Sequence, residues 1–218
     1  LNYKKEAQED IQKQILKITT KKSFRKRRKR HILQKSTLTK RAMITIISGT
    51  NRKGSNSLKV SKTYQNLLKN KGLESQVMDL AELSGDFITN MYGNHTDEVE
   101  ELIKTYVTDV SSFVFVIPEY NGTYTGAVKM FMDGISPSKF NNKNSILVGI
   151  ASGRAGNIMG LDQFTTVLNH LKMEVLSNKV LLSQVDKLIG ENDELNEKSI
   201  LKIINNQLES MIDIFNLK

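Results

Sequence analysis

The 218-residue sequence predicts an α/β fold, a three-layer α/β/α sandwich built on a five-stranded parallel sheet. Short β-branched apolar runs alternate with longer segments in which apolar residues recur every three or four positions. Three of the runs, residues 44–47, 113–117 and 146–150, lead directly into loops that contain glycine. Because parallel strands end at one edge of a sheet, we expect these loops to converge on one crevice and to share one ligand.

The strands are expected at the apolar runs. Residues 44–48 are apolar enough for a strand that is buried on both faces. The last strand has two alternative positions, because apolar residues occur both at 174–176 and at 179–182. The remaining strands are expected at residues 75–80, 113–117 and 145–150.

The helices are expected where apolar residues share one face. The clearest follows Thr96, a favourable N-cap with two acidic residues in the first turn. Residues 81–94 lack this periodicity but contain Phe87, so they form either a lid over a site or a seal at the edge of the core. The expected helices span residues 56–70, 97–110, 127–135, 158–172 and 196–215.

The positive charge of the chain is confined to its first 42 residues. They contain 15 of the 32 Lys and Arg residues but 3 of the 23 Asp and Glu residues, so residues 1–42 carry +12 and residues 43–218 carry −3. Six consecutive cations at 25–30 predict a basic, disordered extension, because like charges repel one another. Three interpretations stay open: Met43 starts the functional protein and the extension is not native, the extension is a native disordered tail, or it binds nucleic acid or another partner.

Composition excludes several other classes. The chain has no cysteine, which excludes disulfides, thiolate metal sites and cysteine nucleophiles. No apolar run approaches the roughly 20 residues of a membrane helix, and the N-terminus is polar, so we expect a cytoplasmic protein without a membrane partner. Neither the histidines His31, His95 and His170 nor any paired carboxylates form a catalytic or metal-binding pattern, and we expect no catalytic side chain and no metal.

The first loop, residues 48–57, has the composition of a phosphate site. It turns through two glycines into the start of a helix, where unpaired backbone N–H groups and the helix dipole favour an anion. It is not a nucleotide triphosphatase loop, because Ser55 stands where the lysine is required, and the chain has no G-x-G-x-x-G motif. Hydroxyl donors come from Thr50, Ser55 and Ser57, and Arg52 adds a cation.

The other two loops suit the rest of a ligand. At residues 120–122, Tyr-Asn-Gly lets the backbone turn with exposed amides, which suits the edge of a flat polar ring. At residues 153–156, two glycines permit close backbone approach and Arg154 supplies charge. An ordinary turn remains the alternative explanation for each loop taken singly.

Two motifs resemble the paired signatures of the NADPH-dependent FMN reductase family, which includes azoreductases, quinone reductases and chromate-reducing flavoenzymes. The resemblance covers about residues 43–180. This chain has Thr125 where many relatives have proline, which leaves the entry of the next helix open. The motifs are Gly49-Thr50-x-Arg52-x-x-Ser55-x-Ser57 and Pro118-Glu119-Tyr120-Asn121-Gly122-x-Tyr124-x-Gly126.

The resemblance implies a flavodoxin-like fold with strand order 2-1-3-4-5, non-covalently bound FMN, and a homodimer or homotetramer. The apolar stripe of the helix at 127–135 would pair subunits, and Glu119 would be a positioning residue. It also implies three groups of cofactor-binding residues. Around the phosphate we expect Gly49, Thr50, Arg52, Ser55, Asn56 and Ser57; beside the isoalloxazine, Pro118, Glu119, Tyr120, Asn121 and Gly122; and from the other side, Ser152, Gly153 and Arg154.

The implied function is an FMN-dependent NAD(P)H oxidoreductase. Hydride from NADPH or NADH would pass through FMN to a small acceptor such as a quinone, an azo compound, a flavin or a metal oxyanion. An electron-transfer flavodoxin is one alternative, although a charge of −3 lacks the strong acidic field expected for docking basic redox partners. A nucleic-acid-binding protein that acts through the basic extension is the other alternative, although we do not expect nucleic acid to be the main partner.

Overall fold

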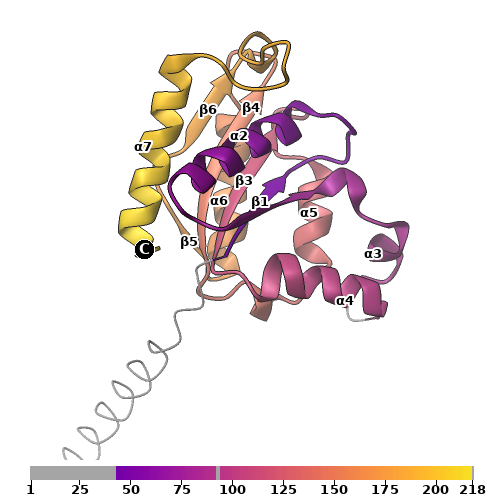
Figure 1. Cartoon of the computed structure of the whole chain (residues 1–218). Helices are drawn as coiled ribbons and strands as arrows, with labels where there is room; N and C mark the ends of the chain where they lie inside the picture. Colours follow the sequence, from indigo (N-terminus) through magenta and orange to yellow (C-terminus); the bar gives the residue numbers. More distant parts are fainter. Residues whose placement is uncertain (1–42, 92–93, 218) are drawn as a thin grey trace, which may run out of the picture. The chain divides into compact units, whose positions relative to one another are not determined.

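A parallel sheet forms the middle layer of the protein (Figure 1). Its strand order is β2-β1-β3-β4-β5, which confirms the order 2-1-3-4-5, and the fold is flavodoxin-like. The computed structural model describes residues 43–91 and 94–217, so the expectations for residues 1–42 lie outside the described part. The strands are β1 (Ile44–Ser48), β2 (Ser75–Asp79), β3 (Ser112–Pro118), β4 (Asn144–Ala151), β5 (Glu174–Val175) and β6 (Val180–Ser183).

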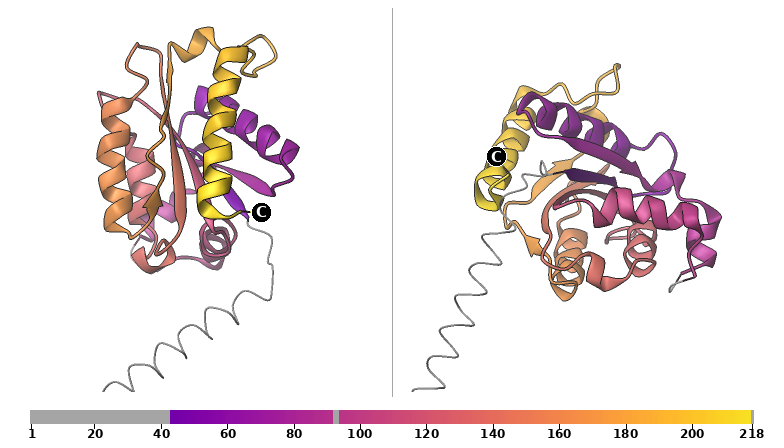
Figure 2. Two further views of the ribbon diagram at one scale, coloured as in Figure 1. Left: turned by 90° about the vertical axis from the view of Figure 1, so that its left-hand side faces the viewer. Right: turned by 60° about the horizontal axis from the view of Figure 1, so that its bottom comes forward.

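Helices cover both faces of the sheet (Figure 2, left). On β3, Phe113, Phe115 and Ile117 belong to one core cluster, and the alternating valines Val114 and Val116 belong to the other. Helices α2 (Asn56–Asn70) and α7 (Lys198–Phe215) pack in the valine cluster. Helices α3 (Gly85–Thr89), α4 (Asp97–Ile103), α5 (Gly126–Asp133) and α6 (Ile158–His170) pack in the phenylalanine cluster. No helix of the described residues is long and apolar enough to cross a membrane.

The fifth strand uses both of the positions that the sequence allows. β5 pairs with Asn144 and Ser145 of β4, and β6 pairs with residues 148–151 of the same strand. The fully buried Gln207 side chain of α7 spans the break, because its Nε2 donates to the carbonyl oxygens of Leu147 at 3.0 Å and Asn178 at 2.8 Å. The amide of Gln207 thus replaces the missing ladder bond.

The helix expected at residues 97–110 changes its winding. It is α-helical from Asp97 to Ile103 and continues as a π-helical turn, Lys104–Thr108. The Nζ of Lys143 donates to the carbonyl oxygens of Val107 at 2.7 Å and Thr108 at 3.0 Å, so a distant side chain satisfies the end of the helix. The periodicity of residues 97–110 does not predict this contact, because Lys143 lies outside that segment.

The segment that follows β2 is more ordered than its sequence suggests. A short 3-10 turn, Leu80–Glu82, precedes α3, whose N-cap is Ser84. The buried ring of Phe87 stacks against Phe131 and against His95, each at 6.0 Å between centroids. This ring seals the edge of the core, as one of the two interpretations proposed.

The apolar stripe of α5 is not available for pairing subunits. Val128, Phe131, Met132 and Ile135 are each at most 2% exposed and belong to the core of the chain itself. The expectation that this stripe pairs subunits is therefore wrong, because these side chains are already buried within one chain. A homodimer or homotetramer stays a prediction that rests on the resemblance.

We predict that Tyr64→Phe lowers the free energy of unfolding by about 1–3 kcal/mol. The buried Tyr64 hydroxyl donates to Oε1 of Gln207 at 2.8 Å, and its loss leaves that oxygen without a partner. Urea unfolding of the two proteins measures the difference. Tyr106→Phe is the control, because the hydroxyl of the half-buried Tyr106 makes no hydrogen bond to a described residue. Equal losses for both variants would contradict the role of the Tyr64–Gln207 bond.

Candidate functional site

A cavity of about 340 Å³ opens at the carboxyl edge of the sheet. The loops after β1, β3 and β4 all reach it, as the sequence predicted, and a fourth segment joins them from the chain beyond β6. Its lining comprises Thr50, Arg52, Lys53, Gly54, Ser55, Asn56, Ser57, Lys59, Pro118, Glu119, Tyr120, Ile150, Ala151, Ser152, Val185 and Asp186. No described residue of 81–91 lines it, so the alternative that this segment forms a lid gains no support.

The chain leaves β1 through a position that only glycine fits. The Gly49 N–H donates to the carbonyl oxygen of Val116 at 2.9 Å. A Cβ on Gly49 would lie 2.8 Å from that same oxygen and 2.9 Å from the side chain of Val128. The hydroxyl of Thr125, the N-cap of α5, donates to the Gly49 carbonyl oxygen at 2.6 Å. Gly49 itself lies outside the cavity lining but fixes where the loop begins.

The loop then forms a cup at the start of α2. Gly54 turns the backbone with φ +63°, and Ser55 caps the helix by accepting from the N–H of Leu58 at 3.2 Å. The first intrahelical bonds begin at Leu58, so the amides of Asn56 and Ser57 lack an intrahelical acceptor. The Ser57 hydroxyl is buried and has no partner among the described residues. With Arg52, Lys53 and Lys59 also on the lining, these donors fit an anion.

Thr50 joins the first loop to the second. Its buried hydroxyl lies 3.0 Å from the hydroxyl of Tyr120 and accepts from the N–H of Arg52 at 3.3 Å. The Thr50 side chain therefore orients two loops at once.

The second loop is a tight two-residue turn. Asn121 and Gly122 have φ values of +52° and +77°, and the amides of Tyr120 and Thr123 each donate to the other's carbonyl oxygen. Residues 118–120 line the cavity, whereas Asn121 and Gly122 do not, so the predicted contact of these two residues with a cofactor gains no support from the lining. The Glu119 carboxylate accepts from the N–H of Asn157 at 3.1 Å, which ties this loop to the start of α6.

The third loop meets the cavity through Ser152. The carbonyl oxygens of Gly153 and Arg154 accept from the Gln184 N–H at 2.8 Å and from the Ser183 hydroxyl at 2.6 Å. These bonds fix the loop to the end of β6. Gly153 and Arg154 lie outside the cavity lining, so their predicted contact with a cofactor gains no support from it.

Asp186 is one of seven lining residues that were not among the predicted cofactor-binding residues; the others are Lys53, Gly54, Lys59, Ile150, Ala151 and Val185. Asp186 belongs to the 3-10 turn Val185–Lys187, and its Oδ1 accepts from Nδ2 of Asn56 at 2.7 Å. Hydrogen bonds from Ser152 and Asn56 hold the pKa of Asp186 below its ordinary value. Nothing in the sequence distinguishes this residue from other surface aspartates, because its partners are more than 30 positions away.

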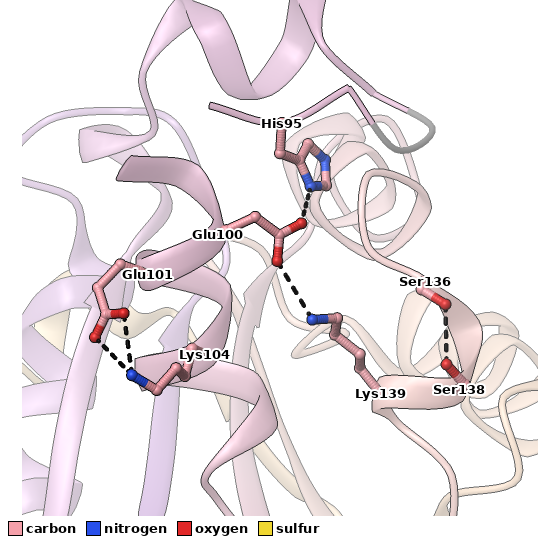
Figure 3. Close-up of polar contacts among 7 residues, drawn as sticks. All are labelled: His95, Glu100, Glu101, Lys104, Ser136, Ser138 and Lys139. Carbon is pink, nitrogen blue, oxygen red and sulfur yellow. Dashed lines mark hydrogen bonds and ion pairs between the residues drawn. The ribbon is translucent and has the colours of Figure 1, made fainter. Parts of the chain in front are cut away.

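A second polar cluster lies outside the cavity lining (Figure 3). The Glu100 carboxylate lies 3.1 Å from Nδ1 of His95 and 3.4 Å from Nζ of Lys139, which connects α4 to the 3-10 turn Pro137–Lys139. Hydrogen bonding by His95 lowers the pKa of Glu100. His170 is exposed at the end of α6, so neither histidine reaches the cup. Within residues 43–91 and 94–217, no three His, Asp or Glu side chains are grouped to hold a metal ion.

The sequence profile described as NADPH-dependent FMN reductase matches residues 42–187. The chain belongs to this family. It is therefore an NAD(P)H oxidoreductase that works with FMN, and both sequence motifs, at residues 49–57 and 118–126, fall within the matched range.

Individual relatives agree with the assignment. The chain is 25% identical over 174 residues to an NADPH azoreductase from Bacillus sp. (strain OY1-2), an overlap of 79% of this chain and 93% of that protein. The fold is similar to that of FerB, a flavoenzyme NAD(P)H:(acceptor) oxidoreductase from Paracoccus denitrificans, with a TM-score of 0.61, 16% identity and coverage of 79% and 96% of the two chains. An NADH:FMN oxidoreductase in its apo form gives a TM-score of 0.60 at 18% identity, covering 77% and 87%.

We predict that Gly49→Ala destabilises the protein by about 1–3 kcal/mol, because the added methyl group overlaps a backbone oxygen and a core side chain. The β1 exit must then shift, so FMN affinity should fall as well. Thermal unfolding and a flavin titration measure the two effects. Gly85→Ala is the control, since a Cβ there meets nothing within 4 Å. An unchanged melting temperature for Gly49→Ala would contradict the close approach.

Proposed function

We propose that the cavity at the carboxyl edge of the sheet binds FMN and that the bound flavin carries two electrons from NAD(P)H to a small acceptor. The observation that carries the proposal is the meeting of an anion cup with two further strand-end loops in one cavity of about 340 Å³. This volume lies within the range of about 300–1,000 Å³ that small-molecule sites occupy.

The cup at the start of α2 is proposed to hold the phosphate. The amides of Asn56 and Ser57, the buried Ser57 hydroxyl and the Arg52 guanidinium offer donors of the kind a phosphate accepts. Gly54 and the Ser55 cap set the direction of these donors before any ligand arrives, so the backbone loses little conformational freedom on binding. The absence of an acidic residue from the first turn of α2 keeps the helix dipole available.

The second loop is proposed to border the flavin ring. Pro118 and Tyr120 line the cavity on the side of β3, and Tyr120 is oriented by its bond to Thr50. Glu119 positions this loop through Asn157, whose side-chain Nδ2 also donates to the carbonyl oxygen of Ile117 at 3.0 Å. Bound FMN supplies reversible two-electron chemistry, and these residues orient it and limit the directions from which a partner approaches.

The acceptor is proposed to be a small conjugated molecule such as a quinone or an azo compound. The azoreductase relative and the NAD(P)H:(acceptor) oxidoreductase with a similar fold support this class. A flavin or a metal oxyanion also accepts electrons from a reduced flavin and is included in the proposal. A flavodoxin that only transfers electrons between proteins is the other candidate, and turnover separates the two.

We predict that Arg52→Ala weakens FMN binding roughly 5- to 150-fold, since a charge-assisted hydrogen bond contributes on the order of 1–3 kcal/mol. Riboflavin, which lacks the phosphate, should bind almost unchanged. Quenching of flavin fluorescence measures both dissociation constants. Lys62→Ala removes an exposed cation of α2 that lies outside the cavity lining, and it serves as the control. Equal losses of FMN and riboflavin affinity for Arg52→Ala would place this residue away from the phosphate.

We also predict that the purified full chain loaded with FMN is yellow and oxidises NADPH or NADH continuously in the presence of a quinone or an azo dye. Loss of nicotinamide absorbance under anaerobic conditions measures the rate with each acceptor. A protein that is reduced once by NAD(P)H but does not turn over with any small acceptor would favour electron transfer between proteins. A colourless protein that FMN does not stabilise against heat would overturn the proposal.

A further inference from the structure

We propose that Asp186 acts as a built-in anionic competitor in the cup, so that it sets how strongly the protein prefers FMN over riboflavin. The inference rests on the proposed function, because it assigns the phosphate of FMN to the cup. It concerns a residue outside both sequence motifs.

The Asp186 carboxylate engages donors that face the cavity. Its Oδ1 accepts from Nδ2 of Asn56, the first residue of α2, at 2.7 Å. The Ser152 hydroxyl of the third loop stabilises the charged form of the same carboxylate and so lowers its pKa. All three residues line the cavity, and Arg52 adds electrostatic attraction. A carboxylate and a phosphate ester are both oxygen anions, so these donors suit either group.

The backbone that carries Asp186 is held in place by the two residues before it. The preceding Val185 is only 2% exposed and packs in the core cluster of α2 and α7. Gln184 has φ +50°, and its N–H donates to the carbonyl oxygen of Gly153 at 2.8 Å. The side chain of Asp186, in contrast, is exposed. Phosphate binding therefore requires rotation of one side chain and no displacement of the loop.

The charges around the cup are nearly balanced, so the Asp186 carboxylate has a large effect on the electrostatic potential in the cavity. The cations on the lining are Arg52, Lys53 and Lys59, and the anions are Glu119 and Asp186. Lys59 forms an ion pair with Asp193 at 2.7 Å, which draws part of its charge away from the cavity. A phosphate that enters the cup thus meets both a competitor for hydrogen bonds and a like charge.

Asp186→Asn in the full chain tests the proposal, since it removes the charge and preserves the size and one acceptor oxygen. FMN should bind about 3- to 15-fold more tightly, and the gain should shrink as salt rises because the carboxylate is exposed. Riboflavin affinity should change by less than about twofold, because this ligand carries no phosphate. The control is Asp213→Asn, which makes the same change of net charge at an exposed position of α7 outside the cavity lining.

Inorganic phosphate provides a second measurement that does not need flavin binding. Phosphate should raise the melting temperature of Asp186→Asn more than that of the original protein or of Asp213→Asn. An unchanged or weaker FMN affinity in Asp186→Asn would overturn the proposal. A parallel loss of FMN and riboflavin would also overturn it and would place Asp186 against the ribityl chain. If no protein binds either flavin, the proposed function fails, and the phosphate measurement still decides the role of Asp186.

Discussion

The close approach between Gly49 and the neighbouring strand is the constraint on which the site depends. Because no side chain separates Gly49 from Val116, β1 continues its pairing with β3 up to the point where the first loop begins. The Thr125 hydroxyl then links the Gly49 carbonyl to the N-terminus of α5. One small residue thus places the anion cup, the second loop and a helix start in a fixed relation, and the site inherits the rigidity of the sheet.

Some polar groups of the site face the cavity, where a ligand would bind, and others hold the loops of the site together. Asn56 and Ser57 present donors to the cavity, whereas Thr50, Glu119 and Asn157 connect one loop to another. Such connections matter in an enzyme whose chemistry belongs to a flavin, because the protein contributes mainly orientation and the field around the ring.

The sequence alone predicted the elements whose signals are local. The isoleucine run of β1 and the helix that Ser55 caps were expected at the bounds that the structure has. Features that depend on distant partners were missed. The carbonyl oxygens at the end of the π-helical turn accept from Lys143. Asp186 contacts the cup through Asn56, which lies 130 positions earlier in the chain. The Asn121-Gly122 pair was correctly expected to turn the backbone, and its contact with a cofactor stays a prediction, because neither residue lines the cavity. Composition therefore predicted the loops that meet at the cavity, and tertiary contacts decide which of their residues line it.

The broken fifth strand also bears on how copies of this protein can associate. An edge strand normally exposes a continuous row of backbone donors and acceptors to which a strand of another molecule can add. Here the edge consists of two short pieces, and the Gln207 side chain already occupies the carbonyl oxygens of Leu147 and Asn178 at the gap. An incoming strand would find no uninterrupted ladder on this side. The interruption therefore disfavours the addition of a strand at this edge of the sheet, whereas β2 forms the other edge.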